Sequence, residues 1–147
     1  MQKEPFKILI NVDGGSRGNP GPSAIGVVIG GGGQEKRYSE FLGQLTNNEA
    51  EYWAVIFALK KARQLFGQDK IKNAEVEIFL DSELVVNQLN AQYKIKEERL
   101  FPLFIKVWNL KIDFGNVVFK LVPREKNRVA DRLVNQELDK KEQSQIF

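Results

Sequence analysis

Apolar stretches predict three strands in the first part of the chain. An apolar run from Phe6 ends at the acid Asp13, and Gly14-Gly15 then breaks the strand. A loop rich in glycine and proline follows, and Ala24 to Ile29 resumes as a second apolar strand. After a turn of glycines, the alternation from Glu35 to Leu42 predicts a third strand. We expect these strands to pair as an antiparallel meander.

The apolar positions change to helical spacing after Thr46. Thr46 and Glu49 stand in a capping-box relation, which predicts a helix start, and the helix runs to about Phe66. The face of Glu49 is expected to emerge into solvent. Glu51 begins the face that packs on the sheet, because an apolar stripe follows it at helical spacing. That stripe consists of Val55, Ala58, Leu59 and Ala62.

The position of Glu51 indicates a function. An acid on a buried helix face costs free energy unless it is paired or binds a metal ion. We therefore assign a functional role to Glu51 and a structural role to Glu49, although the two residues are close in sequence.

Strand and helix patterns alternate in the second half of the chain. Ala74 to Leu80 predicts a strand that ends at Asp81, and Ser82 begins a helix from Glu83 to Leu89. The other expected elements are a polar connection (67–73), a core helix (100–112), a strand (117–122) and a final helix (128–140), capped by Asn127 and followed by a frayed tail. Antiparallel strands followed by strand–helix alternation predict an α/β mixed sheet.

The composition limits the possible chemistry. The 147 residues suit one domain, 1–147, and no apolar run has the length of a membrane span or signal peptide, so we expect a cytoplasmic protein. The chain has no cysteine and no histidine, which excludes thiolate and imidazole chemistry. Catalysis must come from carboxylates, Lys, Tyr, Ser, Thr or a metal ion with oxygen ligands. The net charge of +3 is weak support for a polyanionic partner.

Acids at two strand ends and two helix starts could converge on one edge of the sheet. They are Asp13, Glu51, Asp81 and Asp131. Alternative roles are a turn at Asp13, a helix cap at Asp81 and a favourable helix-dipole position at Asp131. Clustered carboxylates suit Mg²⁺ or Mn²⁺. Two such ions about 4 Å apart can activate water and stabilise the leaving oxygen in phosphodiester cleavage.

The chain resembles type 1 ribonuclease H through motifs that occur in order across most of its length. These are VDGGSRGNPGPSAIGVVI, TNNEAEYWAVIFAL, IFLDSELVVNQLN and VPREKNRVADRL. The resemblance implies a five-stranded mixed sheet with helices on both faces. It also implies endonucleolytic cleavage of the RNA strand of RNA–DNA hybrids, which leaves a 5′-phosphate and a 3′-hydroxyl. The catalytic, metal-binding acids would be Asp13, Glu51, Asp81 and Asp131, with two Mg²⁺ or Mn²⁺ ions per site.

The resemblance also implies contacts to the substrate. The segment of Gly14, Gly15, Ser16 and Arg17, together with Asn47 and Asn48, would lie along the minor groove of the hybrid. Asparagine amides can contact 2′-hydroxyl groups there, and this contact distinguishes RNA from DNA. Thr46 would hold a phosphate. Turn and cap roles are the alternatives for these residues, and both roles can coexist.

The chain departs from the family pattern in two places. Many relatives carry a histidine in the loop before the last acid, where this chain has Arg124, Glu125 and Lys126. Arginine does not transfer protons near neutral pH, so Arg124 is expected to act by charge, on a phosphate or in product release. The region 90–103 also lacks a long basic helix, so affinity would be lower or would rest on the cations Lys94, Lys96 and Arg99.

We therefore expect a monomeric, metal-dependent ribonuclease H that acts on RNA–DNA hybrids, without a membrane or a protein partner. One alternative is a catalytically idle nucleic-acid-binding module of the same fold. A pure phosphate binder would have no reason to keep an anionic cluster, which speaks against it. Another alternative is a nuclease of the same fold that acts on double-stranded RNA or a DNA junction.

Overall fold

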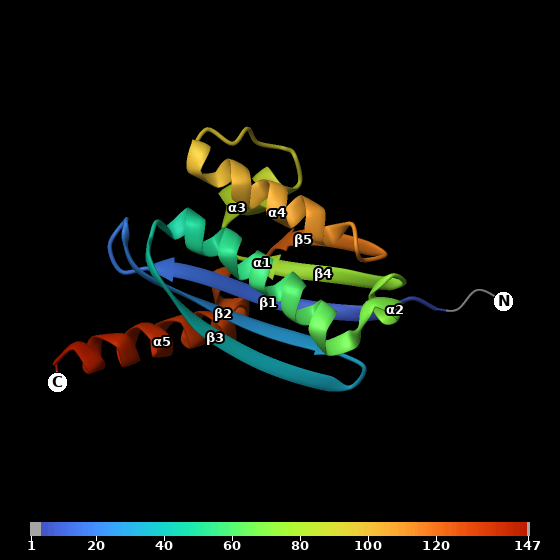
Figure 1. Cartoon of the computed structure of the whole chain (residues 1–147), viewed down its shortest axis with the longest axis horizontal. Coiled ribbons are helices and arrows are strands. Elements are labelled where there is room, and N and C mark those ends of the chain that lie inside the picture. Colours follow the sequence, from blue (N-terminus) through green and yellow to red (C-terminus); the bar gives the residue numbers. More distant parts are fainter. Residues whose placement is uncertain (1–3, 147) are drawn as a thin grey trace.

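A five-stranded mixed sheet forms the centre of the computed structural model, which describes residues 4–146 (Figure 1). The strand order is β3-β2-β1-β4-β5. The first three strands form an antiparallel meander, and β4 and β5 run parallel to β1. The elements are β1 (Phe6–Ser16), β2 (Gly21–Gly31), β3 (Gln34–Leu45), α1 (Asn47–Phe66), α2 (Gln68–Ile71), β4 (Ala74–Leu80), α3 (Glu83–Leu89), η1 (Glu98–Leu100), α4 (Phe101–Lys111), β5 (Asn116–Leu121), η2 (Arg124–Lys126) and α5 (Arg128–Ile146).

Helices cover both faces of the sheet, as expected. The main hydrophobic core lies between the sheet and α1, α3 and α4. A smaller cluster of Ala24, Val134 and Leu138 joins β2 to α5 on the other face. Figure 1 shows α1 in front of the sheet and α5 behind it. Within residues 4–146, no helix combines the length and the apolar character that crossing a bilayer would need.

Several elements agree closely with the sequence. β4 and α3 have the predicted bounds, and α1 begins after Thr46 with both hydrogen bonds of the capping box. The glycine turn between β2 and β3 is also present, with Gly32 and Gly33 at positive φ. Short-range cap and turn chemistry determines these boundaries, so they can be read locally.

The predicted break at Gly14-Gly15 is wrong, because β1 continues to Ser16. Gly14 pairs with Ile25 and Gly15 with Ala24, so both glycines are part of the ladder with β2. A Cβ on Gly14 would lie 2.2 Å from the carbonyl oxygen of Ala50. Glycine is therefore needed at this position for close packing of α1 on the strand, and Asp13 lies inside the strand rather than at its end.

Three other sequence predictions need correction. The tail after residue 140 is not frayed, because α5 continues to Ile146; Phe147 lies outside the described residues. The polar connection 67–73 contains the short helix α2. The face of Glu49 does not emerge fully into solvent, because Ile56, which follows Glu49 on that face, is buried in the core. In the last case, packing of α1 on the sheet overrides the local pattern.

Candidate active site

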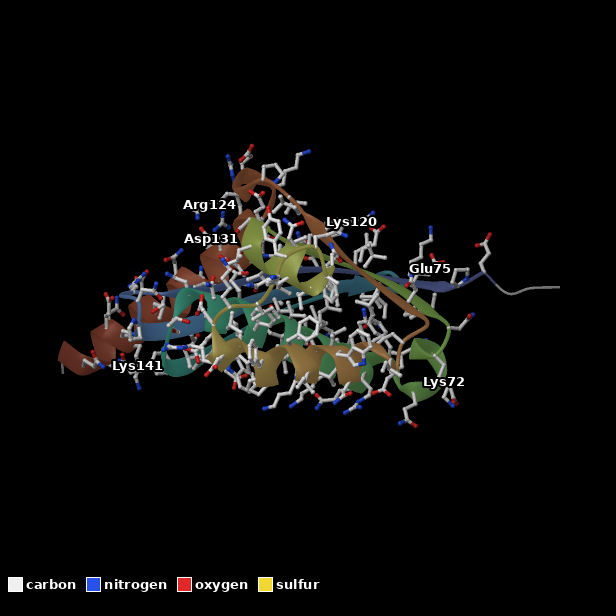
Figure 2. All side chains as sticks on the ribbon, turned by 90° about the horizontal axis from the view of Figure 1, so that it is seen from above. Lys72, Glu75, Lys120, Arg124, Asp131 and Lys141 are labelled. Atoms are coloured by element: carbon white, nitrogen blue, oxygen red, sulfur yellow. The ribbon has the colours of Figure 1, made fainter. Side chains whose placement is uncertain are left out.

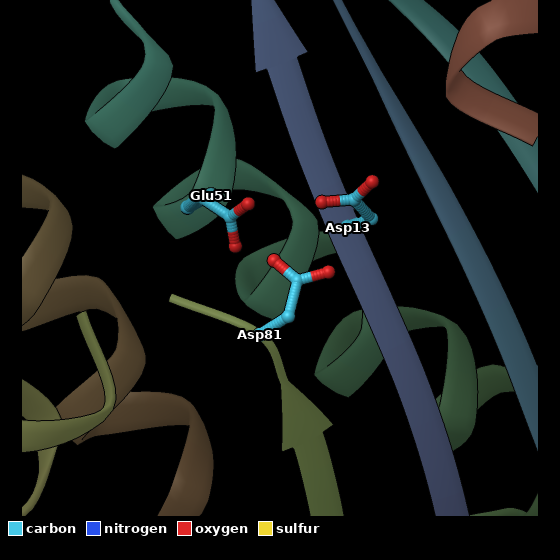
Figure 3. Close-up of side chains that lie close together, drawn as sticks. All are labelled: Asp13, Glu51 and Asp81. Atoms are coloured by element: carbon cyan, nitrogen blue, oxygen red, sulfur yellow. The ribbon is translucent and has the colours of Figure 1, made fainter. Parts of the chain in front are cut away.

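Three carboxylates from three elements meet at one edge of the sheet. Asp13 lies on β1, Glu51 in the first part of α1, and Asp81 directly after β4. One oxygen from each side chain lies within 4.8 Å of the other two (Figure 3). The register of the parallel strands β1 and β4 explains why Asp13 and Asp81 are close. Asn11 pairs with Phe79, so Asp13 and Asp81, each two residues further on, lie level with each other.

Close packing of α1 on β1 positions Glu51. Ala50, the residue before Glu51, contacts Gly14, the residue after Asp13. The Gly14 amide donates a hydrogen bond to Glu51 Oε1 at 3.3 Å. The side chain is buried, and Glu51 Oε2 has no hydrogen-bond partner among the described residues. Within residues 4–146, Glu51 thus has a buried carboxylate oxygen that receives no hydrogen bond, on a side chain that lies close to two other acids.

Burial and mutual repulsion destabilise the ionised acids. Burial raises the pKa of Asp13 to about 7, and the charges of Asp81 and Asp131 contribute in the same direction. Burial, followed by the charge of Asp13, raises the pKa of Glu51 well above its ordinary value. No ion pair within residues 4–146 involves any of these acids. A divalent cation would supply the missing positive charge, and an all-oxygen donor set fits Mg²⁺ or Mn²⁺.

Asp131 lies beside this cluster rather than within it. It is in the first turn of α5 and lines the same pocket of about 400 Å³, and its charge acts on Asp13. The group whose oxygens lie within 4.8 Å of one another contains only Asp13, Glu51 and Asp81 among the described residues. The structure thus brings three of the predicted acids together and places the fourth in the pocket wall, on the same side of the molecule as Arg124 (Figure 2).

The structural alternatives for Asp13 and Asp81 receive little support, whereas Asp131 does lie in the first turn of α5, where the helix dipole favours an acid. Asp81 is not the cap of α3, because Ser82 Oγ accepts the hydrogen bond from the Val85 amide. Asp13 does not form a turn, because it pairs with Gly26 inside the sheet. Glu49, in contrast, does have the structural role expected of it, since it completes the capping box with Thr46.

Most predicted substrate-contact residues line the same pocket. The lining includes Gly14, Gly15, Ser16, Arg17, Asn47, Asn48 and Arg124. Thr46 is not in the lining and caps α1. The Ser16 amide donates to Asn47 Oδ1 at 2.9 Å, and the Asn47 amide donates to Asn19 Oδ1 at 3.0 Å. These bonds hold the loop after β1 against the start of α1.

Two of these side chains already have acidic partners. Arg17 forms ion pairs at 2.7 Å with both Asp139 and Glu142 of α5. Asn48 Nδ2 donates to Glu97 Oε1 at 2.9 Å. Both side chains, which the sequence assigned to substrate contact, are therefore engaged by carboxylates in this structure.

Sequence analysis missed a buried amide behind the site. Asn127 was assigned a capping role, but its side chain donates to the Val12 carbonyl and to Asp81, and it is 1% exposed. A polar residue before a helix is typical of a cap, so the local pattern concealed these long-range hydrogen bonds.

Comparisons with known proteins agree with this geometry. A family model described as reverse transcriptase-like matches residues 11–137. The bifunctional protein Rv2228c of Mycobacterium tuberculosis is 36% identical over 142 residues, which cover 95% of this chain and 37% of the relative. Ribonuclease HI of Halobacterium salinarum is 39% identical over 129 residues, which cover 86% of this chain and 62% of the relative. The chain therefore spans only part of the length of these two relatives.

A solved structure shares most of the fold. LC11-RNase H1, isolated from compost by a metagenomic approach, is 46% identical and superposes with a TM-score of 0.85 over 92% of this chain and 97% of its own. The same protein has been solved in complex with an RNA/DNA hybrid, with 45% identity, a TM-score of 0.84 and coverage of 91% and 98%. The strand order, the position of the acids and these similarities together show that the chain belongs to the type 1 ribonuclease H family.

Proposed function

We propose that this protein is an endoribonuclease that hydrolyses the RNA strand of RNA–DNA hybrids with Mg²⁺ or Mn²⁺. The main support is the group of carboxylate oxygens from Asp13, Glu51 and Asp81 within 4.8 Å of one another, in a pocket of about 400 Å³. The similarity to LC11-RNase H1, which was solved with a hybrid, supports the substrate class. The products would be a 5′-phosphate and a 3′-hydroxyl.

The acids have separate roles in this proposal. Asp13, Glu51 and Asp81 would hold the cations, and Asp131 would contribute from the pocket wall. Two bound ions would supply Lewis-acid activation of a water and stabilisation of the leaving oxygen. The partial burial of the cluster keeps bulk water from screening its charges, so cation binding is favoured.

The residues of the pocket rim orient the hybrid. Asn47 and Asn48 present amide groups suited to 2′-hydroxyl contacts, and the segment from Gly14 to Arg17, at the end of β1, follows the hybrid backbone beside them. Arg124 remains charged at neutral pH, so it stabilises a phosphate rather than transferring a proton. We also propose that residues 1–147 act as one catalytic domain and as a monomer.

A cleavage assay tests the proposal directly. A hybrid labelled on the RNA strand is incubated with Mg²⁺, Mn²⁺ or EDTA, using the wild-type protein and Asp81→Asn. We expect cleavage of the RNA strand only with metal and a loss of at least about 100-fold in Asp81→Asn. Full activity of Asp81→Asn would contradict the assignment. Hybrid binding in EDTA without turnover would favour an idle binding module, and preferential cleavage of double-stranded RNA would favour another target.

A further inference from the structure

Asn127 connects the elements that carry the acids. It lies between η2 and α5, and its Nδ2 group donates to the Val12 carbonyl at 2.8 Å and to Asp81 Oδ2 at 3.3 Å. The backbone carbonyl of Asn127 accepts a hydrogen bond from the backbone amide of Asp131 at 3.1 Å. Asn127 therefore contacts β1 one residue before Asp13, the carboxylate after β4, and the first turn of α5.

Chemistry determines the orientation of this amide. A backbone carbonyl and a carboxylate accept hydrogen bonds only, so both must face the Nδ2 group. On the opposite side, Asn127 Oδ1 accepts a hydrogen bond from Asn11 Nδ2 at 3.2 Å. A flipped amide would lose the bonds to Val12 and Asp81 and would place Oδ1 against two acceptors. The side chain is 1% exposed, so water does not compensate for such a loss.

Asp81 depends on this contact for its orientation. Among residues 4–146, Asn127 is the one hydrogen-bond donor to the Asp81 carboxylate. Figure 3 shows the Asp81 side chain directed toward Glu51 and Asp13. A donor that holds one oxygen from behind restricts rotation of the carboxylate and leaves its other lone pairs free for a cation. Such outer partners of metal ligands typically change affinity or activity by about 10- to 100-fold when removed.

We propose that Asn127 is a positioning residue that fixes Asp81 for cation binding. This inference rests on the proposed function, because it assumes that Asp81 binds a catalytic cation. Asn127 does not touch the substrate; it acts through Asp81. A donor at this position is required, so the isosteric Asn127→Asp, which places an acceptor against Asp81, is expected to be at least as harmful as Asn127→Ala.

The test compares these variants with Asn90→Ala. The side-chain amide of Asn90 also donates a hydrogen bond to a backbone carbonyl, that of Phe119 at 3.1 Å, but it forms no hydrogen bond with the acids of the site. Mn²⁺ binding is measured without substrate by calorimetry, and kcat and KM for the hybrid are measured at saturating Mn²⁺. For both Asn127 variants we expect Mn²⁺ affinity and kcat to fall about 10-fold or more, with KM for the hybrid nearly unchanged. Asn90→Ala should lose stability only.

The outcomes separate this inference from the proposed function. If the Asn127 variants fold and bind Mn²⁺ as tightly as the wild type, with normal kcat, the positioning role is wrong although ribonuclease activity stands. If the wild type cleaves no hybrid but the Asn127 variants bind Mn²⁺ more weakly, the proposed function fails and the positioning role stands.

If the Asn127 variants do not fold, a measurement on the wild-type protein tests the same inference. The side-chain amide signals of Asn127 in an NMR spectrum should shift when Mg²⁺ is added, because Asp81 changes its charge environment. The corresponding signals of Asn90 should stay in place. An Asn127 signal that does not respond to Mg²⁺ would overturn the inference.

Discussion

Two glutamates in the first part of α1 show how strongly function depends on the helix face. The Glu49 carboxylate accepts from the Thr46 amide at 3.0 Å, and the Glu49 amide donates to Thr46 Oγ1 at 3.2 Å. Glu51 points instead toward Asp13 and Asp81, with a buried oxygen that lacks a donor among the described residues. The same residue type thus serves as a helix cap in one position and as a candidate metal ligand in the other.

Conservative substitutions should separate these roles. Glu51→Gln removes a candidate ligand, and we expect hybrid cleavage to fall at least about 100-fold. Glu49→Gln should retain near-normal activity and lose less than about 0.5 kcal/mol of stability, because glutamine also completes a capping box. Steady-state kinetics and thermal unfolding of both variants measure these effects. An equal loss of activity in the two variants would contradict the assignment by helix face.

The raised pKa of Asp13 should make the metal-free protein sensitive to pH. Asp13 titrates near 3.8 in the unfolded chain and at about 7 in the folded one, so the folded state binds more protons between these values. The free energy of unfolding should therefore fall as the pH rises through this window. In EDTA at a pH above about 7, Asp13→Asn should be more stable than the wild type by on the order of 2 kcal/mol.

Urea unfolding in EDTA across the pH range measures this difference. The advantage of Asp13→Asn should shrink as the pH falls from about 7 and disappear below the ordinary value of 3.8 for aspartate, since the wild-type carboxyl is then protonated in both states. Parallel stability curves for the two proteins would show that Asp13 is not destabilised by its surroundings.

At the scale of elements, two glycines let helices approach the sheet from opposite faces. A Cβ on Gly14 would lie 2.2 Å from the Ala50 carbonyl oxygen, and a Cβ on Gly26 would lie 2.2 Å from that of Ala130. Gly14 pairs with Ile25, so these two residues share one face of the sheet. The next residue, Gly26, therefore faces the opposite side. Ala50 and Ala130 directly precede Glu51 and Asp131. Each contact therefore places an acid beside the end of β1.

Alanine at either glycine should move a helix and its acid. For Gly14→Ala and Gly26→Ala we expect a loss of about 1–3 kcal/mol in stability, together with a fall in kcat of about 10-fold or more. Gly30→Ala in β2 is the matched control, because its Cβ would meet no atom closer than 3.7 Å. Unfolding and single-turnover kinetics measure both quantities. Normal activity in Gly14→Ala and Gly26→Ala would show that helix approach does not control the site.

At the scale of the whole molecule, Arg17 joins the loop after β1 to the C-terminal end of α5. Of its ion pairs with Asp139 and Glu142, the second lies beyond the predicted helix end at residue 140 and links the additional turn to this loop. Arg17 also lines the pocket. The acids of α5 therefore neutralise a cationic side chain of the pocket, and under the proposed function we expect them to compete with the phosphates of a hybrid.

Neutralising these acids should strengthen substrate binding. The double variant Asp139→Asn/Glu142→Gln should lower KM for the hybrid by about two- to fivefold, with the larger effect at low salt. The matched control, Glu77→Gln/Asp113→Asn, also removes two ion pairs but outside the pocket, so KM should change little. An unchanged KM in the first variant would mean that Arg17 serves only to anchor α5.

The sequence predicted the parts of the fold that depend on local chemistry. β4 and α3 have the expected bounds, because their apolar patterns and the Ser82 cap are short-range signals. The end of β1 and the length of α5 depend on contacts far along the chain, which no local window contains. The active-site prediction has the same limit. The four acids could be predicted from their sequence motifs, whereas the role of Asn127 was missed because its hydrogen-bond partners are far away in the sequence.

The contacts of Gly14 and Gly26 with helix carbonyls have a consequence for how the protein can adapt. At both positions the helix backbone lies directly on the strand, so the placement of Glu51 and Asp131 tolerates no added side-chain atom there. A relative that replaced either glycine would have to shift α1 or α5 away from the sheet, and the neighbouring acid would move with the helix. Over evolution we therefore expect these two positions to change only together with the helix that packs on them.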